Sequence, residues 1–265
     1  EKIAFLQYTS GSTSEPKGVM ISYGNLAHNL TCIIKGLAAD TSTIVVSWLP
    51  QYHDMGLIGS YLGTLYCGGS GFYLSPISFI RKPSVWILAI SRYRATHMQA
   101  PNFAYGLAAR KFVNPTGEKI DLSSAKHMIN AAEPVEIGNI HAFYSAFAPY
   151  GLKAGVIYPT YGLAEHTVYV CSNGKQVLKV KKSALESKRT VEAVGDDSGD
   201  EQDVSTLAGC GIPNELPDLQ LLIVDPDSTE VLKEDKVGEI WVKSGSKAQG
   251  YWGQPEKTEE SFQAR

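Results

Sequence analysis

YTSGSTSEPKGV, residues 8–19, lies between two apolar runs that we expect to be β-strands, residues 3–7 (IAFLQ) and residues 18–22 (GVMIS). Its glycine and small residues leave backbone N–H groups open to a ligand. Residues 9–13 add four hydroxyl groups as further hydrogen-bond donors, and the Lys17 ammonium adds a positive charge. The stretch therefore predicts a phosphate loop, a concave site for a polyphosphate that directly follows a strand.

The loop differs from the Walker phosphate loop, which requires Gly directly before the Lys and Ser or Thr directly after it. Here Pro16 precedes Lys17 and Gly18 follows it. The alternative interpretation is an ordinary flexible surface loop, which the Gly, Ser and Thr content alone would favour. The fixed order TSGST, two residues, PKG resembles instead the phosphate loop of the adenylate-forming superfamily. This superfamily includes acyl-CoA synthetases, peptide-synthetase adenylation domains, luciferases and fatty acyl-AMP ligases.

Three further stretches resemble the same superfamily in the same order along the chain: WLPQYHDMG (residues 48–56), NAAEPV (130–135) and YPTYGLAE (158–165). The first follows an expected strand over residues 43–49, and ligands bind at the carboxyl ends of strands in open α/β sheets. A single His or Glu is usually structural or solvated. Four stretches in one order favour the functional interpretation.

The resemblance assigns a role to each of these stretches. The phosphate loop would bind the β- and γ-phosphates of ATP through Thr9, Ser10, Gly11, Ser12, Thr13 and Lys17. His53 would orient the carboxylate or the phosphates, and Glu165 would ligate Mg²⁺, so both are the candidate catalytic residues. The adenine, stacked on Tyr161, would lie against Ala131, Ala132, Glu133, Pro134, Tyr161, Gly162, Leu163 and Ala164.

Two positions depart from the superfamily pattern, because Gly is common where this chain has Ala131 and Ser14. A methyl group at Ala131 makes the adenine contact of this backbone less secure. Ser14 would be strained in a conformation with positive φ. These departures keep open the alternative of a non-catalytic module that binds lipid or nucleotide with the same fold.

Within the superfamily, the resemblance is closest to the fatty acyl-AMP ligases. It extends over HDMGLIG, PNFAYGLAAR, AEPV, GEIWVKS and GYWGQPE, and over a long tract that follows the YGLAE motif. In those enzymes an insertion at this place restrains the C-terminal domain and disfavours acyl-CoA formation. Residues 172–206 form a charge-dense tract here, and we expect an ordered insertion whose tip, residues 195–203, is mobile. The alternative is a solvated loop without a function.

The implied reaction is ATP- and Mg²⁺-dependent conversion of a fatty acid carboxylate to an acyl-adenylate with release of pyrophosphate. The resemblance implies an acyl carrier protein or polyketide synthase module as the acceptor, and a C-terminal domain of the same parent chain as a further partner. An acyl-CoA synthetase is the alternative. We expect the alkyl chain along small and apolar residues: Met55, Gly56, Leu57, Ile58, Pro101, Asn102, Phe103 and Tyr105.

Composition is that of a globular enzyme. The chain has 265 residues, 43% of them hydrophobic, and a net charge of −3, which gives no bias towards nucleic acid. Its four cysteines form no CxxC pair, so neither a zinc site nor a disulfide framework is indicated. Residues 55–80 carry no charge, but glycines and Pro76 divide them into a helix of about 14 residues and a short strand. We expect no signal peptide, because Glu1 and Lys2 lead directly into an expected strand, and we expect a cytoplasmic protein.

Strands alternate with helices up to about residue 208, which predicts an α/β fold with a mostly parallel sheet covered by helices on both faces. Ser22 is the expected N-cap of a helix that ends at Leu37. From residue 209 a β-meander predicts a small, barrel-like all-β subdomain. We expect residues 1–208 to be an AMP-binding subdomain incomplete at its N-terminus, and residues 209–265 to be truncated at the C-terminus. The chain would then be a fragment that is inactive alone.

Overall fold

The computed structural model describes residues 2–9, 16–114, 117–195, 201–213 and 218–263. Five parallel strands form its main sheet, in the order β4-β3-β5-β6-β7. The strands are β3 (Ile44–Ser47), β4 (Ser70–Tyr73), β5 (His97–Pro101), β6 (His127–Ala131) and β7 (Ile157–Pro159). Together with the helices described below, this sheet confirms the predicted α/β class.

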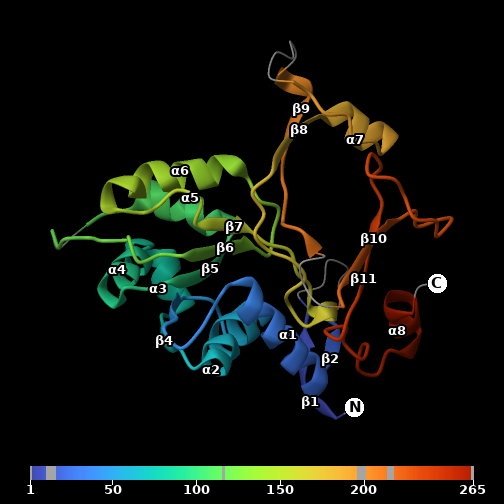
Figure 1. Ribbon diagram of the computed structural model, residues 1–265, viewed down its shortest axis with the longest axis horizontal. Coiled ribbons are helices and arrows are strands. Elements are labelled where there is room, and N and C mark those ends of the chain that lie inside the picture. Colours follow the sequence, from blue (N-terminus) through green and yellow to red (C-terminus); the bar gives the residue numbers. More distant parts are fainter. Residues whose placement is uncertain (1, 10–15, 115–116, 196–200, 214–217, 264–265) are drawn as a thin grey trace.

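Helices form a layer on each side of this sheet (Figure 1). On one side α4 and α5 contact the strands and α6 packs on α5. On the other side η1 contacts β3 and β5, and α1 and α2 pack on η1. The helices are α1 (Tyr23–Gly36), η1 (Met55–Leu62), α2 (Gly63–Cys67), α3 (Pro76–Arg81), α4 (Ser84–Tyr93), α5 (Asn102–Lys111) and α6 (Ile137–Phe147).

Helix α1 begins as the sequence predicts. The Ser22 hydroxyl accepts a hydrogen bond from the Asn25 backbone N–H at 3.1 Å, and the Ser22 N–H donates to the Asn25 side chain at the same distance. This reciprocal capping box satisfies two backbone donors at the helix start. Leu37 is the C-cap, so the predicted end is also confirmed.

The uncharged stretch after residue 54 is helical, but its first part is not an α-helix. Residues 55–62 form the π-helix η1, which continues into the short α2 and then, beyond a left-handed Gly68, into β4. The expected helix of about 14 residues followed by a short strand is therefore confirmed, and the first part of this helix is π-helical. Gly56 packs directly on the backbone, because a Cβ atom there would lie 2.1 Å from the Pro50 carbonyl oxygen. No helix in the described ranges is both long and apolar enough to cross a bilayer.

Three antiparallel strand pairs stand apart from the main sheet (Figure 1). The first pair, β1 (Ile3–Tyr8) and β2 (Gly18–Ser22), flanks the phosphate loop. The second pair is β8 (Val177–Lys181) with β9 (Val204–Ala208), and the third is β10 (Gln220–Val224) with β11 (Glu239–Lys243). Between β10 and β11, residues 230–232 (EVL), which we expect to be the middle run of the β-meander, form no named strand, and Val231 makes a single bridge to Val224.

The predicted insertion contains β8, α7 (Lys182–Lys188), the short η4 (Glu201–Asp203) and most of β9. Its far side contacts the β10–β11 turn, where the Val191 N–H donates to the Asp235 carbonyl at 2.8 Å. The Val237 N–H donates to the Arg189 carbonyl at 2.9 Å. Residues 196–200, within the stretch for which we predict a mobile tip, lie outside the described residues. The boundary between the two subdomains stays a prediction.

The main hydrophobic core fills the space between the sheet and its helices, around Trp86, Phe79, Tyr105 and Phe143. A second, smaller cluster joins β2 to the end of the chain. It contains Val19, Ile21, Ala248, Tyr251 and Phe262, the last of which lies on α8 (Pro255–Phe262). Burial of apolar surface thus holds the last part of the chain against the strand that follows the phosphate loop.

Candidate active site

A pocket of about 650 Å³ opens where strands β5 and β6 end and the phosphate loop begins. Its lining contains polar side chains, among them Lys17, His53 and Glu165, which we call the polar end, and apolar ones, among them Ile33, Leu37 and Val168, which we call the apolar end. Its described lining consists of Gln7, Tyr8, Thr9, Pro16, Lys17, Ile33, Leu37, Tyr52, His53, Asp54, Met55, Gly59, Gln99, Ile129, Ala131, Ala132, Thr160, Tyr161, Gly162, Ala164, Glu165, Val168 and Tyr169. Residues from all four of the motifs recognised in the sequence therefore meet around one cavity.

The described ends of the phosphate loop close on each other beside this pocket. The Thr9 N–H donates to the Lys17 carbonyl at 3.0 Å, and the Lys17 N–H donates to the Thr9 hydroxyl at 3.4 Å. Both residues line the pocket. The other four loop residues with a predicted role, Ser10, Gly11, Ser12 and Thr13, lie outside the described residues, as does Ser14. Phosphate binding by this loop stays a prediction.

His53 and Asp54 form a pair at the mouth of the pocket. The His53 Nδ1 atom lies 2.7 Å from the Asp54 Oδ1 atom, which also accepts a hydrogen bond from the Met55 backbone N–H at 2.7 Å. The hydrogen bond with Asp54 raises the pKa of His53 above its ordinary value, against the opposing effect of partial burial, and the negative charge of Asp54 adds to the increase. Because 46% of the His53 side chain is exposed, the imidazole is accessible to a ligand.

Glu165 lies on η3 (Ala164–His166), the single 3₁₀ turn that follows the tyrosine motif. Its Oε1 atom accepts a hydrogen bond from the Tyr251 hydroxyl at 2.7 Å. Its backbone carbonyl accepts from the Ala248 N–H at 2.9 Å. Glu165 and Asp54 are the carboxylates in the described lining, and Asp54 is already engaged with His53. Glu165 is therefore the better candidate for a metal ligand.

Tyr161 and Gly162 line the pocket beside Ala131 and Ala132. Tyr161 is held by its backbone, whose N–H donates to the Cys171 carbonyl at 2.9 Å. Gly162 cannot carry a side chain without movement, since a Cβ atom there would lie 1.7 Å from the Val168 carbonyl oxygen. Ala132 has a positive φ of 70°, which turns the chain at the pocket edge. These residues form a surface on which a flat ring could stack.

Some residues with a predicted adenine contact lie away from the described lining. Glu133, Pro134 and Leu163 are among them. The Glu133 carboxylate instead accepts a hydrogen bond from the Phe103 backbone N–H at 2.6 Å, at the start of α5. This bond ties the segment after β6 to the neighbouring helix. The roles of Glu133 and Pro134 stay predictions.

Apart from Met55, the residues of the apolar end lie outside the four motifs. Ile33 comes from α1 and Leu37 is the C-cap of this helix, Ile129 comes from β6, and Val168 comes from the loop after η3. Gln99, Tyr169 and two residues of η1, Met55 and Gly59, complete this end. Of the eight residues predicted for the alkyl chain, Met55 lines the described pocket.

The remaining predicted alkyl contacts are placed elsewhere: Gly56, Leu57, Ile58, Pro101, Asn102, Phe103 and Tyr105. Two of these residues lie outside the pocket because they pack in the core. Ile58 is fully buried, and Tyr105 is fully buried with its hydroxyl donating to the Ile129 carbonyl at 2.8 Å. Tyr105 thus lies behind the strand whose Ile129 side chain lines the pocket. A contact of these residues with an alkyl chain stays untested.

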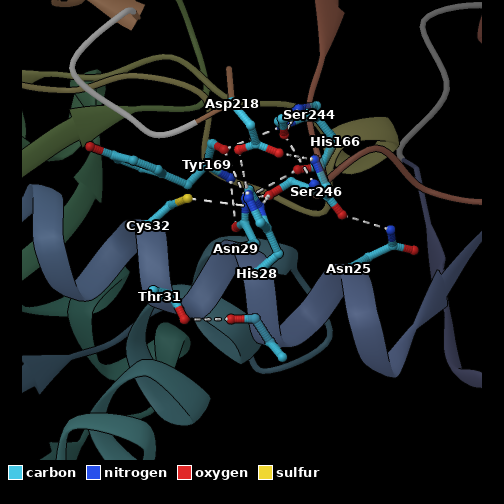
Figure 2. Close-up of polar contacts among 12 residues, drawn as sticks. Asn25, His28, Asn29, Thr31, Cys32, His166, Tyr169, Asp218, Ser244 and Ser246 are labelled. Atoms are coloured by element: carbon cyan, nitrogen blue, oxygen red, sulfur yellow. Dashed lines mark hydrogen bonds and ion pairs between the residues drawn. The ribbon is translucent and has the colours of Figure 1, made fainter.

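A polar cluster fixes the loop after η3 against α1 (Figure 2). Asn29 binds both backbone groups of Tyr169, donating to its carbonyl at 2.9 Å and accepting from its N–H at 3.1 Å. The Tyr169 ring points away from the cluster. His166, whose Nε2 atom lies 2.9 Å from the Ser244 hydroxyl, joins the same cluster, and burial lowers its pKa to about 4. The neutral imidazole therefore has a structural role beside Glu165.

The same cluster contains a serine, a histidine and an aspartate in contact. His28 lies 2.7 Å from the Ser246 hydroxyl and 2.9 Å from Asp218 (Figure 2). Ser246 is only 1% exposed, and its hydroxyl also accepts a hydrogen bond from Asn29 at 2.9 Å. A nucleophile must reach its substrate. We therefore interpret this arrangement as a structural link between α1 and the β10–β11 region.

The chain was compared with known proteins. The sequence profile of the AMP-binding enzymes matches residues 1–252. The medium-chain-fatty-acid–[acyl-carrier-protein] ligase JamA of Moorena producens is 39% identical over all of this chain, which covers 45% of that protein. The long-chain-fatty-acid–AMP ligase FadD32 of Mycolicibacterium smegmatis is 37% identical over 98% of this chain, which covers 42% of that protein. The chain thus spans less than half the length of these relatives.

Solved structures of fatty acyl-adenylate ligases are also similar to this chain. A fatty acyl-adenylate ligase from Legionella pneumophila, crystallised with acyl adenylate and pyrophosphate, superimposes with a TM-score of 0.89 at 41% identity. The superposition covers 97% of this chain and 44% of that one. Because the family profile covers almost the whole sequence, the relationship extends well beyond the four motifs. The chain belongs to the family of AMP-binding enzymes.

Proposed function

We propose that the protein activates a fatty acid with ATP, forms an acyl-adenylate with release of pyrophosphate, and transfers the acyl group to an acyl carrier protein. One observation carries this proposal: a single pocket is lined both by Lys17, His53 and Glu165 and by a set of apolar side chains. A substrate that combines a charged nucleotide with a long alkyl group would meet both kinds of lining. The relatives whose names specify an acyl-carrier-protein ligase support the acceptor.

In the proposed reaction, a carboxylate oxygen of the fatty acid attacks the α-phosphorus of ATP. The bond from this phosphorus to the oxygen that bridges to the β-phosphate breaks, and pyrophosphate leaves with the electron pair. Such chemistry depends mainly on positioning and on charge neutralisation. Lys17 would hold the departing phosphates, Tyr161 would stack on the adenine, and protonated His53 would lie beside the phosphates. The family resemblance and the shared pocket support these roles.

Mg²⁺ fits the donor set at the polar end. Among the described residues, no three His, Cys, Asp or Glu side chains group into a metal site. A cation beside Glu165 would therefore take most of its ligands from phosphate oxygens and water, which is the usual way in which proteins bind Mg²⁺. When bound, Mg²⁺ supplies positive charge to the phosphate oxygens. We propose Glu165 as its protein ligand, and the cytoplasm as the compartment that supplies ATP.

The competing function is acyl-CoA synthesis, which shares the first half-reaction. A relative with the printed name putative fatty-acid–CoA ligase FadD21 is 35% identical over 98% of this chain, so the alternative has direct support. The decisive experiment measures pyrophosphate release by the full-length protein with a panel of fatty acids. The acyl product is then identified with CoA and with a phosphopantetheinylated carrier protein. Acyl carrier without acyl-CoA supports the proposal, and efficient acyl-CoA formation overturns it.

A substitution at Gly59 is expected to shorten the accepted fatty acid. Gly59 lines the pocket, and a leucine side chain there would displace the end of the Gln99 side chain, which a Cβ atom would meet at 2.5 Å, and fill part of the cavity. Each buried methylene contributes about 0.8 kcal/mol, so each methylene excluded by Gly59→Leu should lower kcat/KM about fourfold. The converse variant Ile33→Ala should improve the longer acids. The measurement is the chain-length profile of pyrophosphate release.

Gly56 is unsuitable for this test, because any side chain there meets the Pro50 carbonyl. Gly56→Leu should lower the melting temperature and reduce activity with every acid alike, which distinguishes a damaged fold from a shortened cavity. Chain-length profiles of Gly59→Leu and Ile33→Ala that match the wild-type profile would place the alkyl chain outside this pocket.

The pH profile of adenylate formation should depend on Asp54. The Asp54 carboxylate raises the pKa of His53, so the imidazolium persists to a higher pH than that of an ordinary histidine. Asp54→Asn removes this charge, and the loss of activity that follows deprotonation of His53 should then begin at a lower pH. The measurement is kcat/KM for ATP between pH 6 and pH 9, a range that brackets the ordinary pKa of about 6.5. An alkaline limb at the same pH in both proteins contradicts a cationic role for His53.

A further inference from the structure

Tyr251 connects two residues of the proposed nucleotide site that come from distant parts of the sequence. It lies in the GYWGQPE stretch, is only 4% exposed, and packs in the cluster formed with Val19 and Phe262. Its hydroxyl donates to the Glu165 Oε1 atom at 2.7 Å. The Lys17 ammonium lies 4.8 Å from the centre of its ring, within the range of a cation–π interaction.

The backbone around Tyr251 is fixed on β2. The Met20 N–H donates to the Gly250 carbonyl at 2.8 Å, and the Trp252 N–H donates to the Gly18 carbonyl at 2.8 Å. Tyr251 itself forms an antiparallel bridge with Val19. The segment therefore pairs with β2 through one antiparallel bridge and its flanking backbone hydrogen bonds. Its tyrosine is held in one place relative to the phosphate loop.

The Tyr251 hydroxyl is the donor in its contact with Glu165, and the Glu165 carboxylate is the acceptor. A carboxylate has two oxygens with about four lone-pair positions, so one hydrogen bond to Oε1 leaves capacity for a cation.

We propose that Tyr251 is a positioning residue of the nucleotide site, whose hydroxyl orients the Glu165 carboxylate towards the metal while its ring holds Lys17 beside the phosphates. This inference rests on the proposed function and deepens it. A hydrogen-bond partner of a metal ligand fixes the ligand's orientation, and its loss typically weakens metal binding by about 10–100-fold. One side chain from the β10–β11 part of the chain would thus set both charges at the polar end of the pocket.

The test uses Tyr251→Phe in the full-length protein, which removes the hydroxyl and keeps the ring. Binding of Mn²⁺ to the protein–ATP complex, measured by electron paramagnetic resonance, should weaken by about 10–100-fold. Binding of ATP without metal should stay within about twofold of wild type, because the ring still carries Lys17. Tyr251→Leu removes the ring as well and should additionally weaken metal-free ATP binding, by about two- to fivefold.

Tyr144→Phe is the matched control. The Tyr144 hydroxyl accepts a hydrogen bond from the Ile157 N–H at 2.8 Å, away from the pocket, so its loss should change stability without changing metal affinity. In the double variant of Tyr251→Phe with Glu165→Gln, the two effects on metal affinity should not add, since the tyrosine acts through the glutamate.

Unchanged Mn²⁺ affinity in Tyr251→Phe, alongside weakened affinity in Glu165→Gln, overturns this inference and leaves the proposed function intact. Tyr251 would then only pack the cluster on β2, and its loss would appear as a lower melting temperature alone. Failure of the wild-type protein to bind Mn²⁺ and ATP together overturns the proposed function itself.

Discussion

Glu165→Gln is expected to lower Mg²⁺-dependent acyl-adenylate formation by about 10²–10³-fold, the usual effect of removing one group that stabilises developing charge. Glutamine keeps an oxygen that can accept the Tyr251 hydroxyl but has no negative charge, so the hydrogen bond at this position is preserved. The free energy of unfolding should therefore change by no more than about 1 kcal/mol. The measurements are pyrophosphate release over a range of Mg²⁺ concentrations and thermal unfolding.

A matched variant separates the metal role from a general effect of charge. Glu256, in the first turn of α8, is exposed, so Glu256→Gln makes the same chemical change away from the pocket and should leave activity near the wild-type value. Higher Mg²⁺ concentration should partly restore the Glu165→Gln protein. Wild-type rates in Glu165→Gln at low Mg²⁺ would remove this residue from the metal site.

Excision of the insertion is expected to raise acyl-CoA formation at least tenfold while adenylate formation stays near the wild-type rate. The family resemblance implies that this tract restrains a mobile C-terminal domain. The barrier to the second half-reaction would then be a population of domain orientations, with every catalytic group still present. Because a tenfold change corresponds to about 1.4 kcal/mol, a modest shift in this population is sufficient.

The structure supplies the cut sites for this experiment. The chain enters and leaves the insertion at two glycines in contact, since a Cβ atom on Gly174 would lie 1.8 Å from the Gly209 carbonyl oxygen. A two-residue link can therefore replace residues 175–208 without distorting the strands of the sheet. The control protein keeps the insertion and carries the substitution Asp235→Gly. Asp235 lies in the β10–β11 turn that the insertion contacts. Unaltered proportions of acyl carrier and acyl-CoA after excision would show that the tract is a loop without influence on the acceptor.

The sequence motifs identify polar residues that line the pocket, but they do not identify most of its apolar lining residues. This difference has a physical reason. Lys17, His53 and Glu165 lie in short motifs whose residue types are unusual unless they bind something, and all three line the pocket. Ile33 and Leu37 lie on an amphipathic helix, where an apolar side chain normally faces the core. Periodicity shows which face is buried, but it does not distinguish a packed core from a cavity wall.

Tyr251 illustrates the same limit. In the sequence it is only part of the GYWGQPE stretch that carries the family resemblance, and its burial in the second cluster is a finding of the structure. Its hydrogen bond to Glu165 depends on a bridge to Val19 across most of the chain, which no local pattern encodes. The π-helical geometry of η1 was missed in a similar way, because an uncharged run with glycines is compatible with several helix types.

The bridge between Tyr251 and β2 has a consequence for synthesis on the ribosome. Tyr251 is translated more than 200 residues after Lys17. At about 5–20 residues per second, tens of seconds pass between the synthesis of these two residues. If ATP binds as proposed, it would therefore stabilise only the stages of folding that follow the synthesis of Tyr251.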